Sequence, residues 1–294
     1  MRIRQKFATV LLGLLPVLTG CVSYTRLVQK ARPAENLMDA TLEQLAQKTN
    51  ARYDAVQNMT AYVSVQVTTG GTHTGAEKVY TSLGGYIFIR KPEDLRVILK
   101  VPVAGSRAVD MVSDGKHWKL YVPSKNMARE GTGEVTTPSN NALENLRPSI
   151  FFDSMLVKGT NTGQIGTLTS DTRIIPPVDK KQDAIEESDY NLQLLEQPKG
   201  NEAHTLRIVH ISRTNLLPYQ QDVFDPQGNV VTRTFYSNYQ KAGDIQYPMK
   251  IVITRPLDQL SLTITITKLD LTQKLEDDQF ELKIPDGVPV EQMK

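Results

Sequence analysis

A period-two alternation of apolar and polar residues recurs along most of this chain, and it constrains the fold more than any other feature. Val63, Val65 and Val67 alternate with polar residues, and the segment that begins at Leu260 repeats the pattern. Such a period places every second side chain on one face, as in a half-buried β-strand. The apolar register slips near Lys268, which indicates a bulge or a strong bend. With short turns between the segments, the sequence predicts an antiparallel sheet of about ten or eleven strands.

Two segments break this alternation with helical spacing. The first opens at Thr41, where Gln44 completes a weak capping-box signal. The second spans residues 140–157, with Pro148 as a kink or as the start of a second helix. Their apolar residues recur at helical intervals, namely Leu42, Leu45, Ala46, Tyr53 and Val56 in the first segment and Leu143, Leu146, Ile150, Phe151 and Met155 in the second. Strands and helices together predict one α+β domain, with the helices on one face of the sheet.

The N-terminus has the layout of a secretory signal peptide. Its first six residues contain three basic side chains, residues 7–18 are almost wholly apolar, and Leu18-Thr19-Gly20-Cys21 follows. A basic start, a short apolar stretch and small residues before a cleavage site are typical of such peptides. Leu-Thr-Gly-Cys in this place closely resembles the lipobox of bacterial lipoproteins. That resemblance implies a signal peptide over residues 1–20 and lipidation of Cys21, whose thiol is a good nucleophile.

Two other interpretations of this N-terminus fit less well. A transmembrane anchor needs roughly 20 apolar residues, and this run is shorter. An ordinary signal peptide would leave Cys21, the only cysteine in the chain, as a free thiol on an exported protein. Acyl chains on Cys21 would hold the protein on a membrane without spanning it. In the sorting scheme that this resembles, aspartate after the cysteine favours the inner membrane, and Val22 stands there instead. We therefore expect a lipid-anchored protein on the periplasmic side of the outer membrane.

Composition narrows the possible partners. The 294-residue chain has a net charge of +2 and loses three basic residues with its signal peptide, so the mature protein is close to neutral. No basic patch with interleaved aromatic residues is present, which argues against nucleic acid as a partner. Residues 21–38 have mixed polarity and no sustained period, so we expect a lipidated tether there and one domain over residues 39–294. The charged stretch 179–189 is expected to be a solvated loop.

No catalytic motif is evident in the sequence. The four histidines are scattered, and residues 159–166 are rich in glycine but lack the Gly-Lys-Ser/Thr ending of a phosphate-binding loop. The Gly-x-Ser-x-Gly elbow of many hydrolases is also missing. We therefore expect a protein that is not an enzyme and that uses no metal or cofactor.

Three short stretches resemble the LolA/LolB superfamily of periplasmic lipoprotein carriers and outer-membrane lipoprotein receptors. They are Gly-Tyr-Ile-Phe-Ile-Arg-Lys-Pro at residues 85–92, the hairpin at 113–123 and Asp-Gln-Phe-Glu-Leu-Lys-Ile-Pro-Asp-Gly at 278–287. The resemblance covers about residues 40–288. It implies a curved, unclosed half-barrel whose helices cover an apolar cavity on the concave face. Such a cavity could hold acyl chains, which need a dry pocket to cross water. The function implied is lipid or lipoprotein transport or localisation.

The resemblance also implies particular residues. A cavity of this kind would be lined by inward-facing aliphatic and aromatic side chains, namely Leu95, Val97, Leu99, Leu143, Leu146, Phe151, Leu260, Leu262, Ile264 and Ile266. The stretch containing Val101, Pro102 and Val103 resembles the surroundings of the receptors' apolar loop, which implies that it faces a membrane or a partner. The alternative is a structural or regulatory lipoprotein that binds a protein partner. An open cavity favours lipid, whereas a filled core with an exposed apolar patch favours the partner.

Overall fold

The computed structural model describes residues 25–132, 147–177, 179, 181–197 and 200–293. Its α-helices are α2 (Leu42–Ala55) and α3 (Pro148–Met155), and its 3-10 helices are η2 (Pro123–Lys125) and η4 (Asp277–Phe280). The first strands are β1 (Ala31–Pro33), β2 (Asn58–Gly71), β3 (Ala76–Val79), β4 (Leu83–Arg90), β5 (Asp94–Lys100), β6 (Arg107–Ser113), β7 (His117–Val122) and β8 (Met127–Thr132). The others are β9 (Gln164–Ile175), β10 (Ala184–Glu196), β11 (Thr205–Ser212), β12 (Pro218–Phe224), β13 (Val230–Ala242), β14 (Ile245–Arg255), β15 (Leu260–Asp270) and β16 (Val290–Met293).

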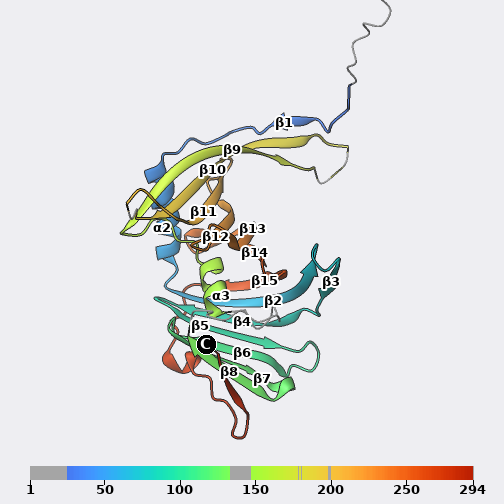
Figure 1. Cartoon of the computed structure of the whole chain (residues 1–294), viewed down its shortest axis with the longest axis vertical. Coiled ribbons are helices and arrows are strands. Elements are labelled where there is room, and N and C mark those ends of the chain that lie inside the picture. Colours follow the sequence, from blue (N-terminus) through green and yellow to red (C-terminus); the bar gives the residue numbers. More distant parts are fainter. Residues whose placement is uncertain (1–24, 133–146, 178, 180, 198–199, 294) are drawn as a thin grey trace, which may run out of the picture.

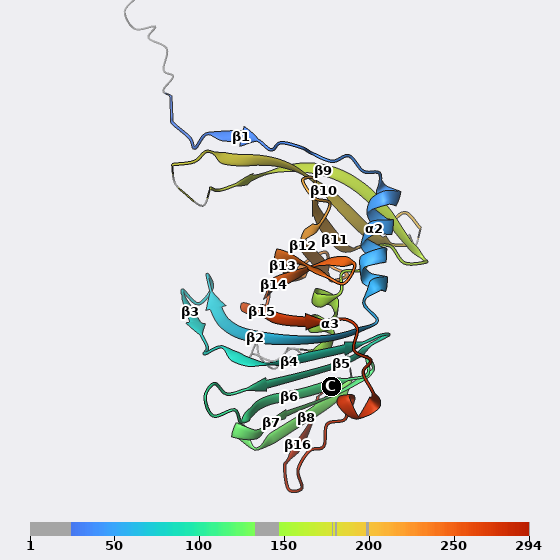
Figure 2. The ribbon, with the colours of Figure 1, turned by 180° about the vertical axis from the view of Figure 1, so that it is seen from behind.

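These strands form one unclosed sheet, as Figures 1 and 2 show from opposite sides. Its order is β1-β10-β11-β12-β13-β14-β15-β2-β4-β5-β6-β7-β8-β16, and β9 and β3 pair with β10 and β2 beside this path. All pairs are antiparallel except β1 with β10 and β8 with β16. The protein is therefore mostly β, with two α-helices among the described residues.

The predicted α+β fold with an unclosed sheet is confirmed, whereas the number of strands, ten or eleven, was wrong. Within the described residues the sheet has 16 strands, and it is mixed rather than purely antiparallel, because two of its pairs are parallel. β1, β3 and β16 are three or four residues long, too short for an alternation to be visible in the sequence. β1 and β16 are also the strands that pair in parallel, and they join the sheet through backbone contacts rather than a buried face. β1 lies inside the stretch expected to be a tether.

The stretch at 179–189 is not wholly a solvated loop, because β10 begins at Ala184. Glu187 is buried, and its carboxylate accepts a hydrogen bond from Thr214 at 3.0 Å. Arg173 on β9 forms a salt bridge with the same carboxylate at 2.7 Å. Glu187 can be buried because pairing and hydrogen bonds satisfy its charge. These partners are distant in the sequence, so the local charge pattern does not reveal them.

Several local predictions were confirmed. Thr41 caps α2, because its hydroxyl accepts from the backbone N–H of Gln44 at 3.3 Å. In return, the backbone N–H of Thr41 donates to Oε1 of the Gln44 side chain at 3.0 Å. α3 starts at Pro148. The register shift of β15 against β2 falls next to Lys268.

Gly85 explains how β4 and β5 can pair so closely, because a Cβ there would lie 1.9 Å from the carbonyl oxygen of Ile98.

One face of the sheet carries the core, and both helices lie on it. Leu45 of α2 packs with residues of β10 and β11 in one buried cluster. α3 packs with residues of β2, β4, β5, β14 and β15 in a second, larger cluster. We call this the inner face. It is continuous across seven strands, because one row of paired positions runs through Leu192, Val209, Gln221, Thr234, Ile253, Leu262 and Val67.

Candidate functional site

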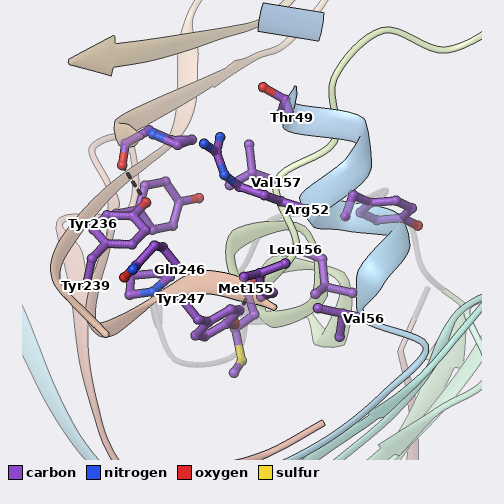
Figure 3. Close-up of a pocket in the computed structure, with 14 residues that line it drawn as sticks. Thr49, Arg52, Val56, Met155, Leu156, Val157, Tyr236, Tyr239, Gln246 and Tyr247 are labelled. Carbon is purple, nitrogen blue, oxygen red and sulfur yellow. Dashed lines mark hydrogen bonds between the residues drawn. The ribbon is translucent and has the colours of Figure 1, made fainter. Parts of the chain in front are cut away.

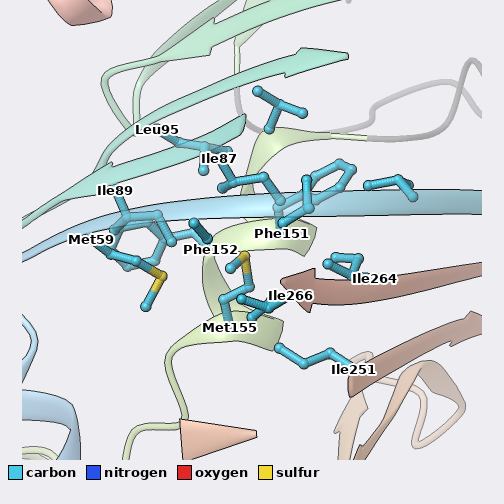
Figure 4. Close-up of a cluster of buried hydrophobic side chains, with 14 of the residues drawn as sticks. Met59, Ile87, Ile89, Leu95, Phe151, Phe152, Met155, Ile251, Ile264 and Ile266 are labelled. Carbon is cyan, nitrogen blue, oxygen red and sulfur yellow. The ribbon is translucent and has the colours of Figure 1, made fainter. Parts of the chain in front are cut away.

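α3 covers the middle of the inner face. This helix has eight residues, and Phe151, Phe152 and Met155 are buried. Figure 4 shows these side chains directed at Met59, Ile87 and the other aliphatic residues of the sheet. The sequence favours this local structure because Pro148 at the first helical turn needs no hydrogen-bonded N–H. α3 is thus a short apolar cover on a sheet that does not close around it.

Polar side chains of the inner face hold the C-terminal end of α3. The Gln221 amide donates to the carbonyl of Asp153 at 3.2 Å, and the Tyr247 hydroxyl donates to the carbonyl of Met155 at 2.8 Å. The Thr234 hydroxyl lies 3.0 Å from that of Ser154. The last carbonyls of a helix lack partners within the helix, so side chains that supply donors fix its position. We call Gln221, Thr234 and Tyr247 the α3 latch.

The described members of the predicted cavity lining are all buried. Each of these side chains is at most 6% exposed. They are Leu95, Val97, Leu99, Phe151, Leu260, Leu262, Ile264 and Ile266. All except Leu260 belong to the cluster under α3. Leu143 and Leu146 lie outside the described residues. The set is therefore brought together on the inner face, packed against the helix, and its role in binding a ligand stays a prediction.

A small cavity lies beside this cluster, between α2, α3 and the β13–β14 hairpin. It has a free volume of about 40 Å³. Figure 3 shows Tyr236, Tyr239 and Tyr247 on one side, with Arg52 of α2 reaching toward them and Met155 of α3 nearby. The other lining residues are Thr49, Tyr53, Val56, Leu156, Val157, Pro218, Ile245, Gln246 and Pro248. The free volume is far below the roughly 300–1,000 Å³ of typical ligand pockets.

None of the described residues of the predicted lining borders this cavity, so sequence reasoning missed it. Tyr236 and Tyr247 lie on the inner face of their strands, and burial raises the pKa of both hydroxyls. A signal was present, because tyrosine on a buried strand face needs a polar partner or an opening. The sequence does not show, however, that α2 and α3 meet the hairpin there.

Positive charge gathers around Tyr53 at the edge of this cavity. Lys91 Nζ lies 3.5 Å from the centre of the Tyr53 ring and Lys158 Nζ lies 5.0 Å from it. Burial lowers the pKa of Lys91 to about 8, and Asp54 partly opposes this while Lys158 adds to it. Ammonium groups over an aromatic face are stabilised by its quadrupole. The apolar cavity therefore has a cationic rim.

The stretch predicted to face a membrane or a partner is an exposed hairpin tip between β5 and β6. Val101 is 39% exposed and Val103 is fully exposed. Val103 has φ +66°, a conformation that β-branched residues rarely adopt. Tyr62, Tyr86 and Lys100 border an open hollow next to this tip. An apolar residue held outward in this way is suited to contact with another surface.

Cys21 lies outside the described residues. Within the described part, no helix combines the length and apolar character that crossing a bilayer requires.

Comparison with known proteins gives matches in structure and none in sequence. No protein-family model and no curated protein matches the chain. A LolA superfamily protein from Nitrosomonas europaea is 13% identical, with a TM-score of 0.48 over 81% of this chain and 97% of that one. A domain described as an outer membrane lipoprotein-sorting protein, from Vibrio parahaemolyticus, is 12% identical, with a TM-score of 0.45 over 82% and 95%. A DUF1329 family protein from Desulfovibrio piger is 16% identical, with a TM-score of 0.48 over 82% and 95%. Each of these three proteins thus resembles the chain in structure over about four-fifths of its length, at low sequence identity.

Proposed function

We propose that this protein is a lipid-anchored envelope protein that binds acyl chains, alone or as part of a lipoprotein, on the inner face of its sheet. It works without catalysis, in lipoprotein or lipid transport or localisation at the outer membrane. In this proposal residues 1–20 are a signal peptide, Cys21 carries the lipid and the binding domain follows a short tether. The lipobox and the lone cysteine support the anchor.

The cover formed by α3 is the observation that carries the binding proposal. A short helix closes a continuous apolar face through side-chain packing and the α3 latch. An unclosed sheet leaves room for this helix to move without breaking strand pairs. Displacing it would uncover aliphatic side chains of β2, β4, β14 and β15, which are suited to contact with hydrocarbon. The cavity of about 40 Å³ beside it then corresponds to the closed state.

In this proposal, the hairpin tip between β5 and β6 contacts the bilayer. Val101, Pro102 and Val103 would enter the lipid surface while acyl chains move to or from the inner face. Lys100 and Tyr86 stand next to the tip, and tyrosine and lysine are typical of membrane–water interfaces.

A second candidate function is binding of a protein partner by a regulatory or structural lipoprotein. The observation in its favour is the packing under α3, where the described residues of the predicted cavity are at most 6% exposed. A permanently filled core would leave the exposed tip at Val103 as the surface for a partner.

Uptake of an acyl chain by the mature protein tests the proposal. The protein to use is residues 21–294 with Cys21→Ser, which keeps every described residue and has no lipid of its own. We expect this chain, purified without detergent, to bind a fluorescent long-chain acyl probe. An acylated lipopeptide should displace the probe, and the same peptide without acyl chains should not. Because only burial of hydrocarbon separates the two peptides, the comparison isolates acyl binding.

Two results would count against the acyl-binding proposal. The first is absence of probe binding together with absence of bound lipid in native mass spectra, which would favour the protein-partner function. The second is equal displacement by both peptides, which would place recognition in the peptide rather than in the acyl chain.

A further inference from the structure

Arg52 brings an unpaired positive charge to the tyrosine-lined cavity. Its Nη2 donates to the carbonyl of Leu216 at 2.8 Å, whereas its Nη1 is buried without a hydrogen-bond partner. Within the described part of the chain it forms no ion pair with a carboxylate. Burial lowers the pKa of its guanidinium, and the nearby Tyr239 acts in the opposite direction. A half-buried charge that lacks a counterion is costly to desolvate, and a bound anion would offset part of that cost.

Three other cations lie near one edge of the same cavity. Lys91 and Lys158 lie over the ring of Tyr53, which lines it. Arg207 donates to the carbonyl of Lys158 at 3.4 Å, and its Nε is buried without a partner. Three carboxylates lie near these cations. Asp54 acts on Lys91, Asp153 lies near Lys158 and Arg207, and Glu93 lies near Asp153. The cations thus outnumber the carboxylates; they are Arg52, Lys91, Lys158 and Arg207. This excess of positive charge favours a bound anion.

The rest of the lining is suited to hydrocarbon. Val56, Leu156, Val157 and Ile245 border the cavity together with Met155 of α3. Apolar walls beside a guanidinium with a free N–H match a molecule with a long apolar tail and an oxyanion at one end, because guanidinium binds carboxylate and phosphate oxygens through charge-assisted hydrogen bonds. A neutral ester or amide head would leave the Arg52 charge unpaired.

We propose that this cavity binds a single acyl chain with an anionic head, a carboxylate or a phosphate, and that Arg52 holds the head while α3 moves to admit the tail. This rests on the proposed acyl-binding function and adds the head-group chemistry and its site. The free volume of about 40 Å³ admits the head and little more, so the tail occupies space that α3 vacates.

The test compares three ligands on the mature chain with Cys21→Ser, each below its aggregation concentration. They are oleate, oleoyl lysophosphatidic acid and methyl oleate, which share one tail and differ in the head. Wild type should bind at least one of the two anions about 10- to 100-fold more tightly than methyl oleate, as expected for a hydrogen bond to a charged group. Arg52→Gln should lose this preference and keep its affinity for methyl oleate. Lys48→Gln removes the same charge from an exposed position on α2 and should retain the preference.

Each outcome decides a separate point. Equal binding of all three ligands by wild type, or a preference that survives in Arg52→Gln, overturns the head-group proposal and leaves acyl binding standing. Binding of none of them overturns acyl binding itself. The anion bound more tightly identifies the head as carboxylate or phosphate. If Arg52→Gln fails to bind methyl oleate, its fold is in doubt and Arg52→Lys decides, because a retained charge must retain the preference.

Discussion

Three polar residues hold α3 on a largely apolar inner face. Gln221 and Thr234 are 1% and 0% exposed, in the same paired row as Leu192 and Leu262, and Tyr247 lies close by. Buried polar groups are retained where partners satisfy them, and the partners of these three side chains are groups of α3. The helix therefore explains why polar residues stand at these buried positions. α3 is therefore held by bonds that can break singly, unlike a strand within the sheet.

Tyr247→Phe tests the latch at the level of one atom. The change removes the donor to the Met155 carbonyl and leaves that carbonyl unsatisfied, which should lower the free energy of unfolding by about 1–3 kcal/mol. Because the lost bond holds α3, uptake of the acyl probe should become faster. Tyr190→Phe is the matched control, since its hydroxyl accepts from the Ala40 amide at 3.1 Å and does not contact α3. Equal acceleration in both variants would show that general loosening, rather than the latch, controls uptake.

Lys91 gives the protein a specific pH dependence. Its pKa of about 8 lies below the unfolded value of roughly 10.4, so the unfolded chain binds more protons between these values. Stability should therefore rise with pH from about 8 toward 10, as the lysine loses the charge that burial disfavours. Chemical denaturation of wild type and Lys91→Met over this range would measure the difference. A slope that is the same in both proteins would assign the dependence to other groups.

At the scale of elements, α3 should be less stable than the strands beneath it. Hydrogen exchange on the empty protein should show its amides exchanging faster than those of β2 and β15, because few bonds must break for it to open. With an acyl ligand bound, its exchange should slow. Protection equal to that of β2, with no change on binding, would instead indicate a permanent core helix.

The elements also show what the sequence could predict. Long strands such as β2 and β15 and the start of α2 were visible, because period and capping are local properties. β1 and β16 were not, since strands of three or four residues are defined by their partners. The cavity escaped prediction for a similar reason. Tyr236 and Arg52 are separated by most of the chain, and only tertiary packing brings them together.

At the scale of the whole molecule, the protein should depend on Cys21 for membrane attachment. Cys21→Ser should abolish incorporation of a labelled fatty acid and release the protein from the membrane, because one apolar hairpin tip is a weak anchor compared with two or more acyl chains. Val103→Asp leaves the lipidation site intact, so this variant should remain attached to the membrane. It should lose only the transfer of acyl chains that requires contact between the hairpin tip and the bilayer. Equal labelling of Cys21→Ser and wild type would exclude Cys21 as the lipidation site.

Locking α3 to the sheet tests the central claim most directly. The hydroxyls of Ser154 on α3 and Thr234 on β13 are 3.0 Å apart, so cysteines at both positions would lie within reach of a disulfide. In the Cys21→Ser background no other cysteine competes. The oxidised double variant, verified by mass, should take up no acyl probe, and reduction should restore uptake. Ser154→Cys alone should be insensitive to oxidation. Uptake by the oxidised, locked protein at the rate of the reduced one would contradict the claim that α3 must move for acyl chains to bind.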